Sequence, residues 1–259
     1  MAISGLVLVL FVLGHMLGNL QFLLGPEAIN AYAYHLHNMP GHPVTLWLIR
    51  LALLFFVGLH VLMAVLLTKE NRQARPDTYD KQRFSSATYA ARTMPMTGAI
   101  ILAFIIFHIL HFTVRVVPEN YDVTIQTATV DLGHGTVIPV FDVFAMMVAG
   151  FSSPVIALFY VIATGLLCMH LTHGVASMFQ SLGLRNEIWR GRLNIASIAY
   201  GWIIFLGFAI IPLSVLVGGY GKEYLQQQQS RWEAAGAALK TDGAGGIALS
   251  ATNEQISDK

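Results

Sequence analysis

Four histidines, each inside a different long apolar segment, are the residues of this sequence best suited to chemistry. They are His15, His60, His108 and His170. In hydrocarbon, a polar group without a partner costs several kcal/mol, so each imidazole calls for a partner. A single histidine in a membrane helix is more often an interhelical hydrogen-bond donor. Four of them on four segments favour haem, with the iron of each haem held between two imidazoles.

The segments that must position these histidines are long and apolar. The 259-residue chain has 55% hydrophobic and 11% charged residues, and its mean hydropathy is +0.61. A helix crosses the hydrocarbon with about 20 apolar residues. Five segments qualify, at residues 2–24, 46–68, 95–117, 154–180 and 195–217. The sequence therefore predicts an all-α integral membrane protein, a bundle of five transmembrane helices that encloses two b-type haems.

Two further segments bound this domain, which we expect to cover residues 1–220. Residues 136–151 are apolar but few, and they include Pro139 and Asp142, so we expect an interfacial segment on the membrane rather than a sixth span. Residues 221–259 have too few apolar side chains for a core, which predicts a polar, flexible C-terminal tail without chemistry of its own.

Charge and cysteine content exclude several classes of function. The formal net charge is +1, so no global field favours nucleic acid. Cys168 is the only cysteine, which excludes an internal disulfide, a thiolate zinc site and an iron–sulfur cluster within this chain. Haem held by histidine remains possible.

Basic residues concentrate in two of the connections between the apolar segments. Those in 69–92 and 181–194 are Lys69, Arg72, Arg75, Lys81, Arg83, Arg92, Arg185, Arg190 and Arg192. Since Lys and Arg stay on the cytoplasmic side, both connections should be cytoplasmic, and 25–45 and 115–153 should face outward. The prediction is a multi-pass protein of a bacterial cytoplasmic membrane, with its N-terminus inside and its C-terminus outside.

Depth in the membrane suggests how the histidines pair. His15 and His108 lie on outward-running segments, both about 20 Å from the inner end at 1.5 Å per residue. His60 and His170 lie on inward-running segments, nearer the cytoplasmic side. Two haem b groups follow, one between each pair. His111 and His173 each follow a candidate by three residues on the same helix, so either could replace it as a ligand. We favour the earlier histidine in both cases.

Short motifs around these histidines resemble a known family. The motifs are Gly14-His15-Met16-Leu17-Gly18-Asn19, Gly58-Leu59-His60, Thr97-Gly98 with His108 ten residues later, and Ser152-Ser153-Pro154 leading through Tyr160 to His170. Together they are similar to the five-helix, dihaem (type B) cytochrome b membrane subunit of succinate dehydrogenase and fumarate reductase. The resemblance implies that His15 and His108 hold the distal haem and that His60 and His170 hold the proximal haem.

The resemblance also implies a division of labour. A flavoprotein subunit would interconvert succinate and fumarate, an iron–sulfur subunit would relay electrons, and this chain would anchor both and exchange electrons with a membrane quinone, usually menaquinone. The chain has no dinucleotide-binding fingerprint and no cysteine cluster, so flavin and iron–sulfur chemistry must belong to the partners.

Other polar residues are candidates for contacts with haem propionates or with quinone. Arg50 and Arg115 lie near the outer ends of their segments, where they would pair with distal propionates or anchor the helices at the interface. His111 and His173 are further candidates for contacts with haem propionates or with quinone. The outward 25–45 connection adds Tyr34, His35, His37 and His42, which would donate hydrogen bonds to a quinone and carry its protons.

Three alternatives remain open at this stage. Dihaem cytochrome b subunits of nitrate reductase, hydrogenase or formate dehydrogenase share the bis-histidine design with other partners. A proton-coupled transporter would use buried histidines without haem, usually with repeated halves and interrupted helices. A structural anchor would bind partners without redox activity.

Overall fold

The computed structural model describes residues 1–74, 89–117, 127–131 and 137–243, and within them the protein is almost entirely helical. The elements are α1 (Ala2–Leu20), α2 (Pro26–His37), α3 (Val44–Gln73), α4 (Tyr89–His108), β1 (Thr127–Asp131), β2 (Val137–Phe141), α5 (Val143–Phe151), α6 (Pro154–Ser181), α7 (Glu187–Leu216) and α8 (Lys222–Gly243). A 3₁₀ turn, Gln21–Leu24, extends α1, and a π-helical turn, Ile109–Thr113, extends α4.

Five helices in the described residues are long and apolar enough to cross a membrane, as predicted. They are Ala2–Leu24, Val44–Gln73, Arg92–Thr113, Pro154–Ser181 and Glu187–Leu216. The third ends before the predicted residue 117, because Arg115 adopts a left-handed backbone with φ of 62°. The fifth begins eight residues earlier than predicted, because the Asn186 side chain accepts a hydrogen bond from the Trp189 amide and caps the helix there. The chain is an all-α multi-pass membrane protein, apart from one small hairpin.

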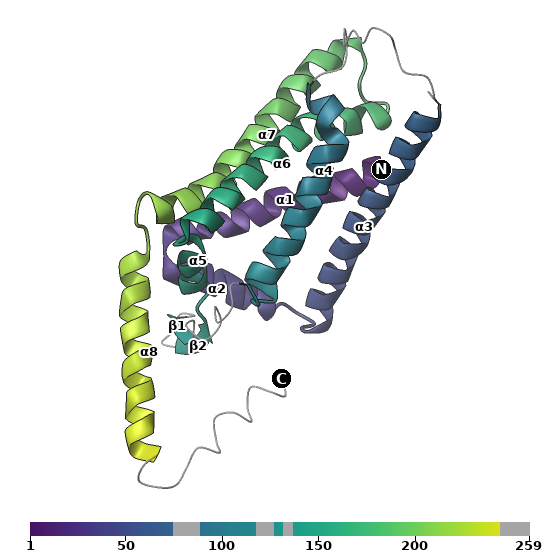
Figure 1. Ribbon diagram of the computed structural model, residues 1–259. Coiled ribbons are helices and arrows are strands. Elements are labelled where there is room, and N and C mark those ends of the chain that lie inside the picture. Colours follow the sequence, from purple (N-terminus) through teal and green to yellow (C-terminus); the bar gives the residue numbers. More distant parts are fainter. Residues whose placement is uncertain (75–88, 118–126, 132–136, 244–259) are drawn as a thin grey trace.

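The spanning helices do not all pack equally. Helices α6 and α7 lie side by side along much of their length, α1 crosses both, and α4 packs on α6 (Figure 1). The Tyr200 hydroxyl of α7 donates to the Val9 carbonyl of α1 at 2.6 Å. Helix α3 stands apart, and no residue of its most apolar stretch is buried. Lipid, or a group between the helices, must therefore cover much of α3.

Short helices and a β-hairpin pack together at one end of the bundle and form what we call the cap. This cap consists of α2, the antiparallel β1–β2 hairpin, α5 and the start of α8. Its core includes the fully buried Phe22, Phe144 and Val148. The described ends of the basic connections, near Gln73 and between α6 and α7, lie at the opposite end (Figure 1). The two connections are thus on one side of the bundle; the membrane face to which that side belongs stays a prediction.

Asp142 ties the elements of the cap together. Its side chain is fully buried, and it accepts hydrogen bonds from Asn30 Nδ2 at 3.1 Å, from the Ala145 amide at 2.9 Å and from the Tyr224 hydroxyl at 2.8 Å. The Phe144 amide donates to Asn30 Oδ1 at 3.0 Å. These bonds join α2, α5 and α8, because a buried carboxyl group must find its donors within the protein.

Three segments of the sequence differ in structure from what their composition suggested. The described residues of the predicted segment 136–151 form no sixth span, as expected, but from Val137 on they are strand β2 followed by the nine-residue α5, which is buried in the cap. The connection 25–45, which we predicted to face outward, contains helix α2. The segment expected to be a flexible tail begins as helix α8, which places Tyr224 and the buried Leu225 in the cap.

Two segments with predictions lie outside the described residues. They are the rest of the expected tail, 244–259, and the part of the basic connection that holds Arg75, Lys81 and Arg83, 75–88.

Candidate functional site

The four predicted histidines meet as two pairs. The rings of His15 on α1 and His108 on α4 have centroids 5.8 Å apart at an interplanar angle of 81°. The rings of His60 on α3 and His170 on α6 have centroids 6.4 Å apart at 63°. We name His15 with His108 the distal pair and His60 with His170 the proximal pair. All four side chains are half-buried.

This spacing fits a metal ion held between two imidazoles. With about 2 Å from each nitrogen to the metal, two rings on opposite sides have centroids roughly 6 Å apart. No group of three or more His, Cys, Asp or Glu side chains in the described part of the chain is placed to hold a metal by itself. Haem iron takes four ligands from the porphyrin and needs only two from the protein, which is the number that each pair offers.

The two pairs lie at different levels of the bundle. On α1, Ser4 lies beside His60 of the proximal pair, and His15 of the distal pair follows eleven residues later. On α4, Thr97 lies beside His170, and His108 follows, again eleven residues later. At 1.5 Å per residue, both helices separate the pairs by about 16 Å. Two redox centres at these levels would form a path along the bundle.

Small residues surround the proximal pair. Ser4 Oγ lies 3.4 Å from His60 Nδ1, and Thr97 Oγ1 lies 3.3 Å from His170 Nδ1. The glycine that follows each hydroxyl residue faces the same ring. A Cβ on Gly5 would be 3.7 Å from Cε1 of His60, and one on Gly98 would be 3.5 Å from Cε1 of His170. Each imidazole therefore lies close to a helix backbone, with room for no more than a methyl group between them.

Aromatic rings surround the distal pair. Phe11 stacks on His15 with centroids 5.3 Å apart at 16°, and Phe208 approaches the same ring at 5.8 Å. Phe104 and Phe112 lie within 6 Å of His108, at 5.9 and 5.8 Å. The Asn19 amide group is 3.4 Å from both ring nitrogens of His15. Apolar rings of this kind exclude water from a cofactor and leave few polar groups beside it.

Tyr160 of α6 lies between two histidines of the distal region. Its hydroxyl is 3.3 Å from His108 Nδ1 and 2.9 Å from His111 Nδ1. His111 lies in the π-helical turn and is fully buried. Because the ring of His108 faces the ring of His15 at 5.8 Å, the arrangement favours His108 as the partner of His15.

The other predicted contact residues do not converge on one place. His173 is half-buried on α6, one turn beyond His170. Arg50 is exposed, with its guanidinium carbon 5.2 Å from the centroid of Trp47. Arg115 lies over the ring of Phe141 at 4.3 Å, against the cap. Both arginines thus have an aromatic neighbour, a role that their sequence positions did not suggest.

The four candidates of the 25–45 connection lie on or just after α2. His35, His37 and His42 are exposed, and His37 Nδ1 donates to the Ala33 carbonyl at 2.9 Å. Tyr34 is half-buried and packs against the hairpin residues Ala128, Val130 and Val140. The structure therefore spreads these residues over the surface of the cap and brings none of them to the distal pair.

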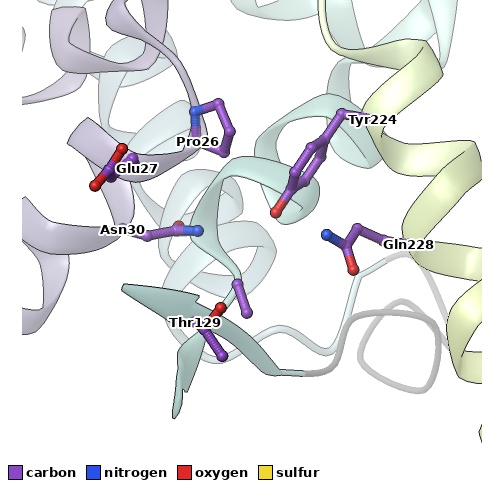
Figure 2. Close-up of a pocket in the computed structure, with 7 residues that line it drawn as sticks. Pro26, Glu27, Asn30, Thr129, Tyr224 and Gln228 are labelled. Carbon is purple, nitrogen blue, oxygen red and sulfur yellow. The ribbon is translucent and has the colours of Figure 1, made fainter. Parts of the chain in front are cut away.

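A pocket in the cap was not predicted. It holds about 220 Å³, and Asn30, Tyr224, Gln228 and Thr129 point toward it from α2, α8 and the hairpin (Figure 2). Burial raises the pKa of Tyr224, and its hydrogen bond to Asp142 adds to this, so the phenol keeps its proton. Since Asn30 and Tyr224 both bond to Asp142, the pocket belongs to the network that holds the cap.

Sequence reasoning did not place Ser4 or Thr97 beside the proximal pair, although it noted the Thr97-Gly98 motif. Ser4-Gly5 precedes His15, and Thr97-Gly98 precedes His108, with the same spacing of nine residues between the glycine and the histidine. Eleven residues make about three helical turns, so the hydroxyl and the histidine share one helix face. This repeated pattern was the signal available, because a hydroxyl in an apolar span needs a partner.

Comparison of the chain with protein-family models, with curated proteins and with solved structures gave no match. The function of this protein is therefore inferred from its residues and their geometry.

Proposed function

We propose that this protein is the dihaem cytochrome b membrane subunit of a succinate:quinone oxidoreductase. The observation that carries the proposal is that four helices each bring one predicted haem ligand into two facing histidine pairs, at spacings that suit two bis-histidine haems. The resemblance of the sequence motifs around these histidines then favours the succinate and fumarate complexes among dihaem systems.

In this proposal the four imidazoles hold the iron and the helices exclude water. When bound, haem supplies one-electron transfer without proton exchange at the iron. His60 and His170 would hold the proximal group and His15 and His108 the distal one, about 16 Å apart along the bundle. The aromatic rings at the distal pair and the glycines at the proximal pair shape the two spaces.

The two ends of the bundle would then serve different partners. The basic end, with Arg185, Arg190 and Arg192, would face the cytoplasm and bind the iron–sulfur and flavoprotein subunits, where succinate and fumarate chemistry takes place. The cap end would lie outside, near the distal pair. Electrons would leave there to a membrane quinone, menaquinone by resemblance, with His111 and the histidines of α2 as candidate proton carriers.

The test is a reduced-minus-oxidised optical spectrum of the purified membrane complex, with haem quantified per chain. It is repeated for His15→Ala, His60→Ala, His108→Ala and His170→Ala, and the co-purifying subunits are identified. We expect two b haems in the parent, loss of one haem in the His15 and His108 variants and loss of the other in the His60 and His170 variants. Succinate should reduce haem in the intact complex. His173→Ala is the matched control and should keep both haems.

Each contrary outcome has a distinct meaning. A parent without haem would overturn the cytochrome proposal. Two haems with a molybdenum or nickel partner in place of a flavoprotein would retain the cytochrome and overturn its assignment to succinate chemistry. Loss of both haems in every variant would contradict the pairing.

A further inference from the structure

The two hydroxyl residues beside the proximal pair share a hydrogen-bonding pattern that their helices impose. Ser4 and Thr97 are each 1% exposed, so no water competes for their hydroxyl groups. Ser4 Oγ donates to the Met1 carbonyl at 2.9 Å. Thr97 Oγ1 donates to the carbonyls of Thr93 and Met94, at 3.1 and 3.2 Å. A carbonyl can only accept, so in both residues the single hydroxyl proton is directed at the helix backbone.

This leaves only oxygen lone pairs for the facing imidazoles. Ser4 Oγ is 3.4 Å from His60 Nδ1, and Thr97 Oγ1 is 3.3 Å from His170 Nδ1. An attractive contact then requires the proton on Nδ1 of each ring. A neutral imidazole carries one ring proton, so Nε2 of both rings keeps its lone pair. Both histidines are thereby held in the tautomer that binds a metal through Nε2.

We infer that Ser4 and Thr97 are positioning residues that set the redox potential of the proximal haem. The inference rests on the proposed function. A hydrogen bond from Nδ1–H raises the basicity of a metal-bound imidazole, and a more basic ligand favours the ferric iron. Two such bonds act on one iron here, one from each side. They lower the midpoint potential of the proximal haem and fix the orientation of its ligands.

The distal pair differs in this respect. Tyr160 shares its hydroxyl between His108 and His111, and the Asn19 amide is equally distant from both nitrogens of His15. The Ser4 and Thr97 hydroxyls lie about 16 Å from this level. Their removal should therefore act on one haem only.

The experiment is a redox titration of the purified complex, followed by haem absorbance, for Thr97→Val, Ser4→Ala and Thr97→Ser. At a fixed ambient potential, Thr97→Val should raise the ratio of ferrous to ferric proximal haem by up to about tenfold, or about 59 mV for one electron. Ser4→Ala should shift it in the same direction, and Thr97→Ser should restore the native value. The distal haem should titrate as in the parent. The His170→Ala variant should lack the proximal haem, so the titration step (wave) missing from this variant belongs to that haem.

Thr164→Val is the matched control. Thr164 is buried on α6 and donates to the carbonyls of Tyr160 and Val161, at 2.9 and 3.0 Å, in the same manner as Thr97. Its loss should leave both waves unchanged. Two haems with unshifted waves in both Thr97→Val and Ser4→Ala would overturn the inference and leave the proposed function intact. The inference is also wrong if Thr164→Val shifts the proximal wave as far as Thr97→Val does. A parent without haem would instead overturn the proposed function.

Discussion

The distal and proximal histidine pairs have nearly the same spacing, but different residues hold them. Around the distal pair, Phe11, Phe104 and Phe208 pack directly on the imidazoles. Around the proximal pair, hydroxyl groups and glycines take that place, and in the described part of the chain no phenylalanine, tyrosine or tryptophan ring stacks on His60 or His170. One pair is thus enclosed by large apolar rings, and the other by close approach of helix backbones.

The pairs also differ in how firmly the rest of the protein supports them. The distal pair is joined to the cap through Tyr160, whose ring is 5.1 Å from that of Phe151 of α5. The proximal pair includes His60 of α3, a helix with little buried surface. The distal site is therefore joined to the packed core of the cap, whereas one ligand of the proximal site lies on a helix with little buried surface.

The largest effect should come from closing the approach to His170. A Cβ at position 98 would make ordinary van der Waals contact with the ring, at 3.5 Å, so Gly98→Ala should be tolerated. Gly98→Leu adds atoms that occupy the position of the imidazole, and in the proposed dihaem protein it should remove the proximal haem while the distal haem stays. Haem content per chain and the optical spectrum measure this. Equal loss of both haems would contradict the independence of the two sites.

A smaller effect, on the other pair, is expected from the cap. Asp142→Ala leaves three donors without their acceptor, and each buried donor left without an acceptor costs about 1–3 kcal/mol. The cap should unfold at a lower temperature, and the distal haem should be lost on heating before the proximal one. Thermal unfolding followed by circular dichroism and haem absorbance tests the order. Asp142→Asn keeps an acceptor oxygen and should fall between the parent and Asp142→Ala.

The smallest effect should come from the stacked ring on His15. Phe11→Leu keeps an apolar side chain but removes a stacking interaction of about 0.5–1.5 kcal/mol. We expect both haems to bind and the distal haem to dissociate at a slightly lower temperature. Leu10→Ala, at a neighbouring position that is 60% exposed, is the control. A stronger effect on the proximal haem than on the distal one would reverse the expected difference between the pairs.

Much of the bundle follows from local sequence, as particular residues illustrate. Five apolar runs predicted five spanning helices, because a run of this length cannot satisfy its backbone in hydrocarbon except as a helix. The pairing of His15 with His108, and of His60 with His170, was suggested by depth, since each residue adds a fixed rise, and was implied by the family resemblance. The partners of Ser4 and Thr97 did not follow, because these contacts join residues 56 and 73 positions apart.

The cap shows where such reasoning ends. Asp142 argued against a sixth span, but nothing local to it indicates Asn30, 112 residues earlier, or Tyr224, 82 residues later. The polar start of α8 lacked the composition of a core and was therefore expected to be flexible. Its order comes from Tyr224 and Leu225, which find partners only once α2 and α5 are in place.

Local sequence was enough to establish that this chain forms apolar helices and that four of them carry a histidine that needs a partner. Both results depend on the length of each apolar run and on the cost of a lone polar group in hydrocarbon, which are properties of single segments. The groups that face each imidazole, and the pair that the cap supports, were set by tertiary packing alone. Those outcomes depend on helix rotation and crossing, which arise from contacts among residues distant in the chain.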